Sequence, residues 1–133
     1  MRPASDSTQI RTWFWPVALF CLAFGLAVPA LAGEADVVGV KVTADDEGFR
    51  FDVTVRHDDE GWDHYADKWE VTGEDGTVYG ERLLLHPHDN EQPFTRSQSG
   101  IVVPEGANEV IVRAHDKVHG FGGREMRVRL PER

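Results

Sequence analysis

Residues 49–56 read Phe-Arg-Phe-Asp-Val-Thr-Val-Arg, and this stretch decides the fold class. Every second position carries an apolar side chain: Phe49, Phe51, Val53 and Val55. Because successive side chains of a β-strand point to opposite faces, a period of two predicts a strand with one buried and one solvent-facing side. The positions between them are charged or polar, as that arrangement requires. We expect a central strand of a β-sheet here.

The same alternation recurs in short runs along the chain. These runs cover residues 38–42, 69–72, 77–86, 94–103, 110–114 and 126–130. Val38, Val40 and Val42 form the apolar side of the first run, and Trp69 is expected in the core. Turn-forming segments separate the runs, and none has the spacing of a three-turn helix. Seven short strands predict an all-β fold, an antiparallel sandwich of two sheets.

The last hairpin resembles that of a known class of domains. Residues 110–130, VIVRAHDKVHGFGGREMRVRL, resemble the closing hairpin of fibronectin type III and bacterial immunoglobulin-like domains. There an alternating strand ends in Ala-x-Asp, a glycine-bearing loop follows, and a second alternating strand closes the domain; Ala114, Asp116 and Gly120 match. The resemblance implies an immunoglobulin- or fibronectin III-like sandwich with a binding or spacing role, and it carries no catalytic residue over. The chain also resembles small exported bacterial proteins of an uncharacterised family, which adds no chemistry.

The beginning of the chain has the composition of a targeting segment. Arg2 and Arg11 precede an apolar run, and Ala30-Leu31-Ala32 supplies the small residues that a signal peptidase reads. We therefore expect a cleaved signal peptide over residues 1–32 and a single sandwich domain over residues 33–133. The protein would be periplasmic or secreted.

The apolar run, residues 13–28, is too short and too early for a good membrane-spanning helix, so no membrane attachment is expected after cleavage. Cys21 is the single cysteine, and Phe20 stands where a lipoprotein signal needs a small residue. Cys21 is therefore expected to leave with the signal peptide, and the mature domain would have neither a disulfide nor a thiolate ligand.

Residues 33–133 are strongly acidic. They contain 12 basic and 22 acidic residues, because Arg2, Arg11 and Asp6 fall in the predicted signal peptide, and their formal net charge is −10. This charge argues against binding to nucleic acid or to anionic lipid. It favours cations or basic partners.

All six histidines lie in three short stretches. They are His57, His64, His86, His88, His115 and His119. If the strands run alternately up and down, the ends and loops that carry these residues share one end of the sandwich. The turns at the opposite end contain no histidine. The sequence therefore predicts a histidine-lined metal site, to which all six residues are candidate ligands.

His86-Pro87-His88 is the strongest local signal for metal binding. Residues two apart on an extended backbone point the same way, and Pro87 stiffens that spacing. Without a cysteine, and with Met126 as the one mature methionine, a soft Cu(I) site is disfavoured, whereas imidazole and carboxylate suit Cu(II) or Zn(II). Acidic residues expected at the same end could be ligands or could orient ring nitrogens: Asp58, Asp59, Glu60, Asp63, Asp89, Glu91 and Asp116. Calcium is the alternative ion, although no loop has the spacing of a known calcium motif.

Structural roles compete with metal binding at several of these positions. His57 and His115, at strand ends, are individually better explained as hydrogen-bonded structural groups. Asp116 is better explained as an acceptor for backbone amides of its own loop. Trp62, Tyr65 and Phe121 either cap the open end of the sandwich or form a partner surface.

These observations favour an exported, non-catalytic module that binds Cu(II) or Zn(II). The alternative is a metal-free protein-interaction module that holds a protein partner through Trp62, Tyr65 and Phe121. No enzyme is expected, because Ser97 and Ser99 lack the neighbouring base that a nucleophile needs. Water activated at an open zinc site would be the one hydrolytic mechanism available.

Overall fold

The computed structural model describes residues 33–133, so the predicted signal peptide and Cys21 lie outside the described residues. The chain forms seven strands: β1 (Asp36–Ala44), β2 (Phe49–Arg56), β3 (Ala66–Thr72), β4 (Val78–Leu83), β5 (Phe94–Ile101), β6 (Glu109–Asp116) and β7 (Met126–Arg129). Within this part of the chain, no helix is long and apolar enough to cross a membrane.

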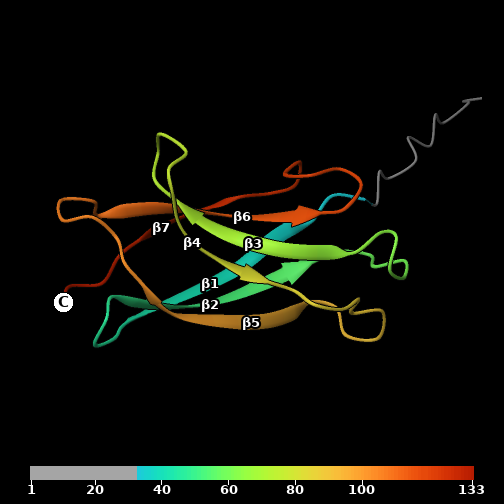
Figure 1. The fold of residues 1–133 in the computed structure, drawn as a ribbon, viewed down its shortest axis with the longest axis horizontal. Helices are drawn as coiled ribbons and strands as arrows, with labels where there is room; N and C mark the ends of the chain where they lie inside the picture. The colour runs from blue at the N-terminus through green and yellow to red at the C-terminus, as the bar shows by residue number, and fades with distance from the viewer. Residues whose placement is uncertain (1–32) are drawn as a thin grey trace, which may run out of the picture.

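The strands form two sheets that face each other across one core (Figure 1). One sheet has the order β1-β2-β5, and the other has the order β4-β3-β6-β7. Every neighbouring pair is antiparallel. The predicted seven-stranded antiparallel sandwich of two sheets is thus confirmed.

The core lies where the alternation of residues 49–56 predicted it. The four apolar side chains of β2 are each at most 2% exposed. They pack against apolar residues of the facing sheet, among them Val71, Val110 and Val112. Trp69 of β3 is fully buried in the same cluster, as predicted.

At the start of β1 the buried residue is Val37, whereas the sequence predicted Val38. The pairing register with β2 shifts between Val37 and Gly39, which leaves Val38 as the extra residue of a bulge. Val37 is therefore fully buried, while Val40 and Val42 pack against the core beyond the bulge. One inserted residue moves every side chain before it to the other face, so period-two counting could not place Val37.

β4 is shorter than the predicted run of residues 77–86. It ends at Leu83, and the backbone N–H of Leu84 then donates to the Asp67 carbonyl oxygen at 2.8 Å. Leu84 is buried, whereas Leu83 and Leu85 are 54% and 75% exposed. Of the three leucines, the middle one closes the edge of the core.

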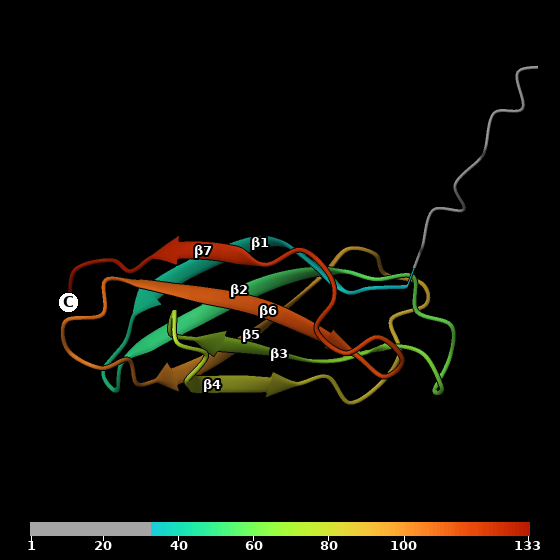
Figure 2. The same cartoon turned by 90° about the horizontal axis from the view of Figure 1, so that it is seen from above.

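The loops gather at two opposite ends of the molecule (Figures 1 and 2). The start of β1 lies at one end together with the β2–β3, β4–β5 and β6–β7 loops, and we call this the histidine end. The β1–β2, β3–β4 and β5–β6 connections lie at the other. All six histidines lie in or beside the first group of loops, so the predicted up-and-down arrangement is confirmed.

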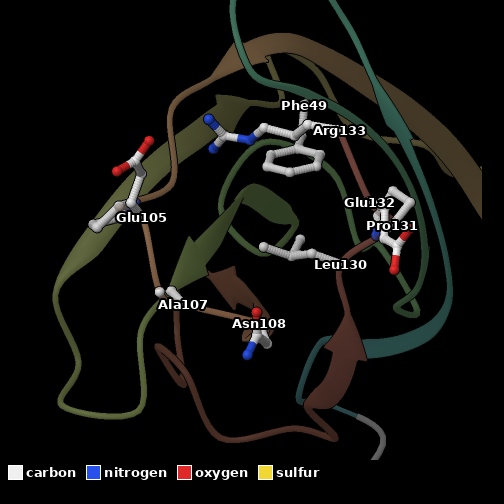
Figure 3. A pocket seen from close by; sticks show the side chains of 10 residues that line it. Phe49, Glu105, Ala107, Asn108, Leu130, Pro131, Glu132 and Arg133 are labelled. Carbon is white, nitrogen blue, oxygen red and sulfur yellow. The ribbon is translucent and has the colours of Figure 1, made fainter.

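A hollow of about 380 Å³ opens at the end without histidines (Figure 3). Phe49, Leu130 and Arg133 lie along its wall. The Arg133 guanidinium stands 4.9 Å from the centre of the Phe49 ring and donates to the Val103 carbonyl oxygen. None of the residues that the sequence singled out for binding lines this hollow.

Candidate functional site

His57 directly follows β2, and its imidazole is completely buried. Its Nδ1 lies 2.5 Å from Oδ1 of Asp59, whose side chain is also completely buried. The Asp59 carboxylate accepts two further hydrogen bonds, from the backbone N–H groups of Ala66 at 3.1 Å and of His88 at 2.6 Å. Asp59 is therefore fixed from three sides, and it turns Nε2 of His57 toward the first described residue, Gly33.

The carbonyl oxygen of Gly33 lies between two imidazoles. It is 2.9 Å from Nε2 of His57 and 3.1 Å from Nε2 of His64. Nε2 of His64 is also 3.4 Å from Oδ1 of Asp116, the last residue of β6. One ligand atom each from His57, His64 and Asp116 lies within 4.8 Å of the other two, and we call these residues the His57–His64–Asp116 cluster.

His119 stands beside this cluster, on its solvent side. Its Nδ1 is 3.2 Å from Oδ1 of Asp116, and its ring centre is 5.1 Å from that of His64. The side chain is 35% exposed, compared with 14% for His64. His119 is thus placed to act as a further ligand on the open side.

Asp116 holds its loop as well as facing the histidines. Oδ1 accepts the backbone N–H groups of Val118 at 2.9 Å and His119 at 2.7 Å, which is the structural role expected from the sequence. Burial by itself would raise the pKa of Asp116, but these two bonds and the nearby His57 outweigh it, and the pKa lies below its ordinary value. Asp116 is accordingly a carboxylate near neutral pH, with a buried negative charge.

The hydrogen-bond acceptors around the cluster outnumber the imidazole N–H hydrogens of two neutral histidines. His57 lies between the Asp59 carboxylate and the Gly33 carbonyl, so both ring nitrogens face acceptors. His64 faces Gly33 and Asp116 on one nitrogen, and Glu60 Oε2 stands 3.6 Å from the other. Oδ2 of Asp116 is buried without any partner, which costs about 1–3 kcal/mol for such a group. Additional positive charge, such as that of a bound cation, would balance this arrangement.

The donor set suits a transition metal. Two bonds of about 2 Å at a tetrahedral zinc ion place their ligand atoms about 3.3 Å apart, so ligand atoms within 4.8 Å of one another need at most about 1.5 Å of closure. Imidazole nitrogens with one carboxylate suit Zn(II) or Cu(II), whereas calcium prefers oxygen ligands throughout. The bond from His57 to Asp59 is the kind of second contact that fixes the tautomer of a metal-binding histidine.

His86 and His88 do not belong to the cluster and line a hollow of about 110 Å³, and Nδ1 of His88 lies 3.8 Å from Oδ2 of Asp59. Their ring centres are 4.6 Å apart, and His88 is stacked on Phe94 at 3.8 Å. Burial lowers the pKa of His88, and the neighbouring Arg96 lowers it further. Arg82 lines the same hollow, so two arginines put positive charge beside the pair. As a metal-binding pair, His86 and His88 stay a prediction.

His115 projects from β6 toward Asp67, away from the cluster. Its Nδ1 lies 2.5 Å from Oδ1 of Asp67, and the ring of Phe121 meets it edge-on at 4.8 Å. Phe121 also contacts the guanidinium of Arg113, 4.2 Å from the ring centre. His115 and Phe121 are thus packed among their neighbours, which is the structural role considered for His115.

The aromatic residues of the β2–β3 loop divide between the two roles considered for them. Tyr65 is 7% exposed, and its ring lies 5.0 Å from the Lys117 ammonium group. Trp62 is 63% exposed and meets Tyr65 edge-on at 5.9 Å. Tyr65 therefore packs into the end of the sandwich, whereas most of the Trp62 side chain is exposed.

The sequence analysis missed one residue of the site and did not distinguish another. Gly33 is not among the predicted site residues, because no side-chain chemistry marks it. Asp59 is one of seven acidic residues predicted as ligands or as groups that orient ring nitrogens, and nothing in the sequence distinguishes it from Asp58. Its role arises from bonds to residues 7 and 29 positions away, which no local pattern reports.

Comparisons with known proteins find a relative of this chain. No family model matches the chain. No solved structure matches it either. A curated protein of Halomicrobium mukohataei, named "Putative lipoprotein", is 49% identical over 94 residues, which is 70% of this chain and 46% of that protein. The chain thus spans about half the length of the curated relative it matches.

Proposed function

We propose that this protein is an exported, non-catalytic module that binds Cu(II) or Zn(II) in the His57–His64–Asp116 cluster, with His119 as a further ligand. The observation that carries the proposal is the convergence of two imidazole nitrogens and one carboxylate oxygen within 4.8 Å. The unpartnered Oδ2 of Asp116 supports it, because a cation would relieve that buried acceptor.

Export and domain type form the second part of the proposal. The name of the Halomicrobium mukohataei relative includes the word lipoprotein, which supports a place in the cell envelope or outside the cell. The signal-peptide pattern of residues 1–32 supports export independently. The sheet orders β1-β2-β5 and β4-β3-β6-β7 support the fibronectin III-like assignment made from the last hairpin. A periplasmic or secreted location follows if cleavage occurs.

Calorimetric titration of residues 33–133 with Cu(II) and with Zn(II) at neutral pH tests the metal site. We expect stoichiometric, submicromolar binding by the wild type and loss of most affinity in the His57→Ala, His64→Ala double variant. His115→Ala is the matched control, because His115 pairs with Asp67 away from the cluster. The His86→Ala, His88→Ala double variant asks separately whether the second pair binds metal.

His57 is buried, so its removal could disturb the fold. His64→Gln therefore serves as a second test. His64 lies in the β2–β3 loop and its side chain is 14% exposed, so the substitution should disturb the fold less. Circular dichroism checks that each variant is folded. Equal affinity in wild type and His64→Gln, or no binding by the folded wild type, would reject the proposed site.

A protein-interaction role is the second candidate function, supported by the exposure of Trp62. Val118 is also 59% exposed in the neighbouring β6–β7 loop. An isolated tryptophan that meets Tyr65 by one edge leaves a large apolar surface open to a partner. Trp62→Ser would abolish partner binding and leave metal affinity unchanged, whereas the substitutions in the cluster would have the opposite effects.

A further inference from the structure

We propose that Gly33 is the N-terminal residue of the exported protein and that its α-amino group, together with its carbonyl oxygen, chelates the metal held by the cluster. This inference rests on the proposed metal-binding function and adds a ligand to it. It also assigns a role to the one residue of the site that has no side chain.

The position of the Gly33 carbonyl oxygen places the backbone nitrogen near the cluster. This oxygen lies 2.9 Å and 3.1 Å from Nε2 of His57 and His64. Standard bond lengths and angles keep the nitrogen of a residue within about 3.6 Å of its own carbonyl oxygen. A metal bound to both atoms would close a five-membered ring of metal, nitrogen, Cα, carbonyl carbon and oxygen.

The packing around Gly33 explains why a glycine stands here. A Cβ at this position would lie 2.4 Å from Cε1 and 2.9 Å from Nε2 of His119, inside van der Waals contact. Gly33 is itself buried. Its backbone therefore lies directly against three histidine rings, and any side chain would push His119 away from Asp116.

Cleavage after Ala32 would change the chemistry of the Gly33 nitrogen. In the uncut chain its lone pair belongs to the planar peptide bond and is a poor ligand. Hydrolysis of the Ala32–Gly33 bond consumes one water, leaves a carboxylate on Ala32 and leaves a free amine on Gly33. Ala30-Leu31-Ala32 is the sequence after which a signal peptidase would make this cut. Export would thus complete the metal site.

The added amine narrows the choice of metal. With the two Nε2 atoms, the Asp116 carboxylate and the Gly33 carbonyl oxygen it gives three nitrogens and two oxygens, before any bond from His119, and this nitrogen-rich set favours tetragonal Cu(II). An α-amino group has an ordinary pKa of about 7.7–8.0, so metal must displace its proton near neutral pH. Affinity for Cu(II) is therefore expected to rise more steeply between pH 6.5 and about 8 when the amine is free.

The experiment compares three forms of residues 33–133, a segment that contains all seven strands and the whole buried core. The first begins at Gly33 with a free amine, released from a fusion partner without extra residues. The second keeps Ala32 in front of Gly33, and the third is acetylated on the Gly33 amine. Cu(II) affinity is measured by competition with a chelator of known strength, and electron paramagnetic resonance counts the nitrogen ligands.

We expect the free-amine form to bind Cu(II) at least about tenfold more tightly than the other two, with one more nitrogen in its spectrum. Equal affinity and equal spectra in the three forms would overturn the inference and leave the histidine site intact. Failure of all three forms to bind would instead reject the proposed metal function.

Mass spectrometry of the protein exported from an expressing cell tests the first half of the inference. A mature chain that begins at Gly33 is expected. A chain that begins at another residue, or that carries lipid on Cys21, would overturn the assignment of the amine. This measurement does not depend on metal. It therefore separates an error in the predicted N-terminus from an error in the proposed metal site.

Discussion

Asp59 hydrogen-bonds the imidazole of His57 inside the histidine end. Oδ1 of Asp59 lies 2.5 Å from Nδ1 of His57, and both side chains are completely buried. The second carboxylate oxygen accepts the backbone N–H of His88. A single aspartate thus joins the end of β2 to the β4–β5 loop. It orients a candidate ligand and holds a neighbouring loop in place.

Asp59→Asn is expected to lower the free energy of unfolding by about 1–3 kcal/mol, because an amide NH₂ would replace one of two oxygens that face donors. Metal affinity is expected to fall about 10- to 100-fold, since His57 loses its orienting partner. Urea denaturation and calorimetric titration measure the two effects. Asp63→Asn, an exposed change in the same loop, is the control and should leave both unchanged. Identical behaviour of the two variants would contradict this role of Asp59.

Gly33→Ala is expected to weaken metal binding more than it weakens the fold. The new methyl group would collide with the ring of His119, which is 35% exposed and can move aside into solvent. We expect a change of less than about 1 kcal/mol in unfolding free energy and a clear loss of affinity for Cu(II). Thermal denaturation without metal and chelator competition measure them. Glu34→Ala, an exposed neighbour, is the control, and a matching loss of affinity there would argue against the collision.

Glu70→Gln tests an ion pair on the outer face of the four-stranded sheet. Burial alone would raise the pKa of Glu70, but hydrogen bonds from Lys68 and Arg113 outweigh it, and the pKa lies below its ordinary value of 4.5. The carboxylate therefore adds stability that is complete above pH 4.5 and is lost as the pH falls through the lower, folded-state pKa. The variant should be less stable than the wild type at pH 7, by about 1–3 kcal/mol, and closer to it at pH 3.

Urea midpoints at the two pH values measure this difference for Glu70→Gln. Glu81→Gln is the matched control, because the exposed Glu81 reaches Lys68 only at 3.6 Å. It should change stability little at either pH. A difference between wild type and Glu70→Gln that does not shrink in acid would count against the ion pair.

His88→Phe tests the buried imidazole that stacks on Phe94. Because burial and Arg96 lower the pKa of His88, the unfolded chain takes up a proton at this residue before the folded one does. The folded state is therefore not penalised by protonation of His88 above about pH 6.5, the pKa in the unfolded chain. Below that pH the free energy of unfolding decreases, until the pH reaches the lower pKa of the folded state. In a chelator-containing buffer, the Phe variant should therefore lose less stability than the wild type between pH 7 and 5.

Thermal melts at several pH values supply the comparison for His88. The comparison variant is His86→Phe, since His86 is exposed, its side chain hydrogen-bonds only the neighbouring Pro87, and its charge lowers the pKa of His88 less than burial and Arg96 do. That variant should keep most of the wild-type dependence on pH. A slope that is unchanged in His88→Phe would show that the titration of another group controls acid stability.

The sequence was sufficient for the strands because their alternation reports which face each residue occupies. β2 buries every residue that the pattern assigned to its apolar side. The same counting failed at Val37, because a bulge inserts Val38 without any residue type that marks it. It also could not fix the end of β4, where three consecutive leucines satisfy either face.

The histidine end was predictable from strand direction, but the ligand set within it was not. His86 and His88 were predicted as metal ligands because their two-residue spacing can be read directly from the sequence. His57, His64 and Asp116 meet only after the loops close over distances of up to 59 residues, and Gly33 contributes backbone alone. Loop closure depends on buried bonds such as those of Asp59, which have no local signature.

The described chain contains no cysteine, so no disulfide can tie its two sheets together. His57 follows β2 of one sheet, while Asp116 ends β6 of the other. An ion held by both would act as a removable cross-link, closing a loop of about sixty residues without any redox chemistry. The mechanical strength of this end of the protein would then follow the supply of free metal, and it would be lowest where metal is scarce.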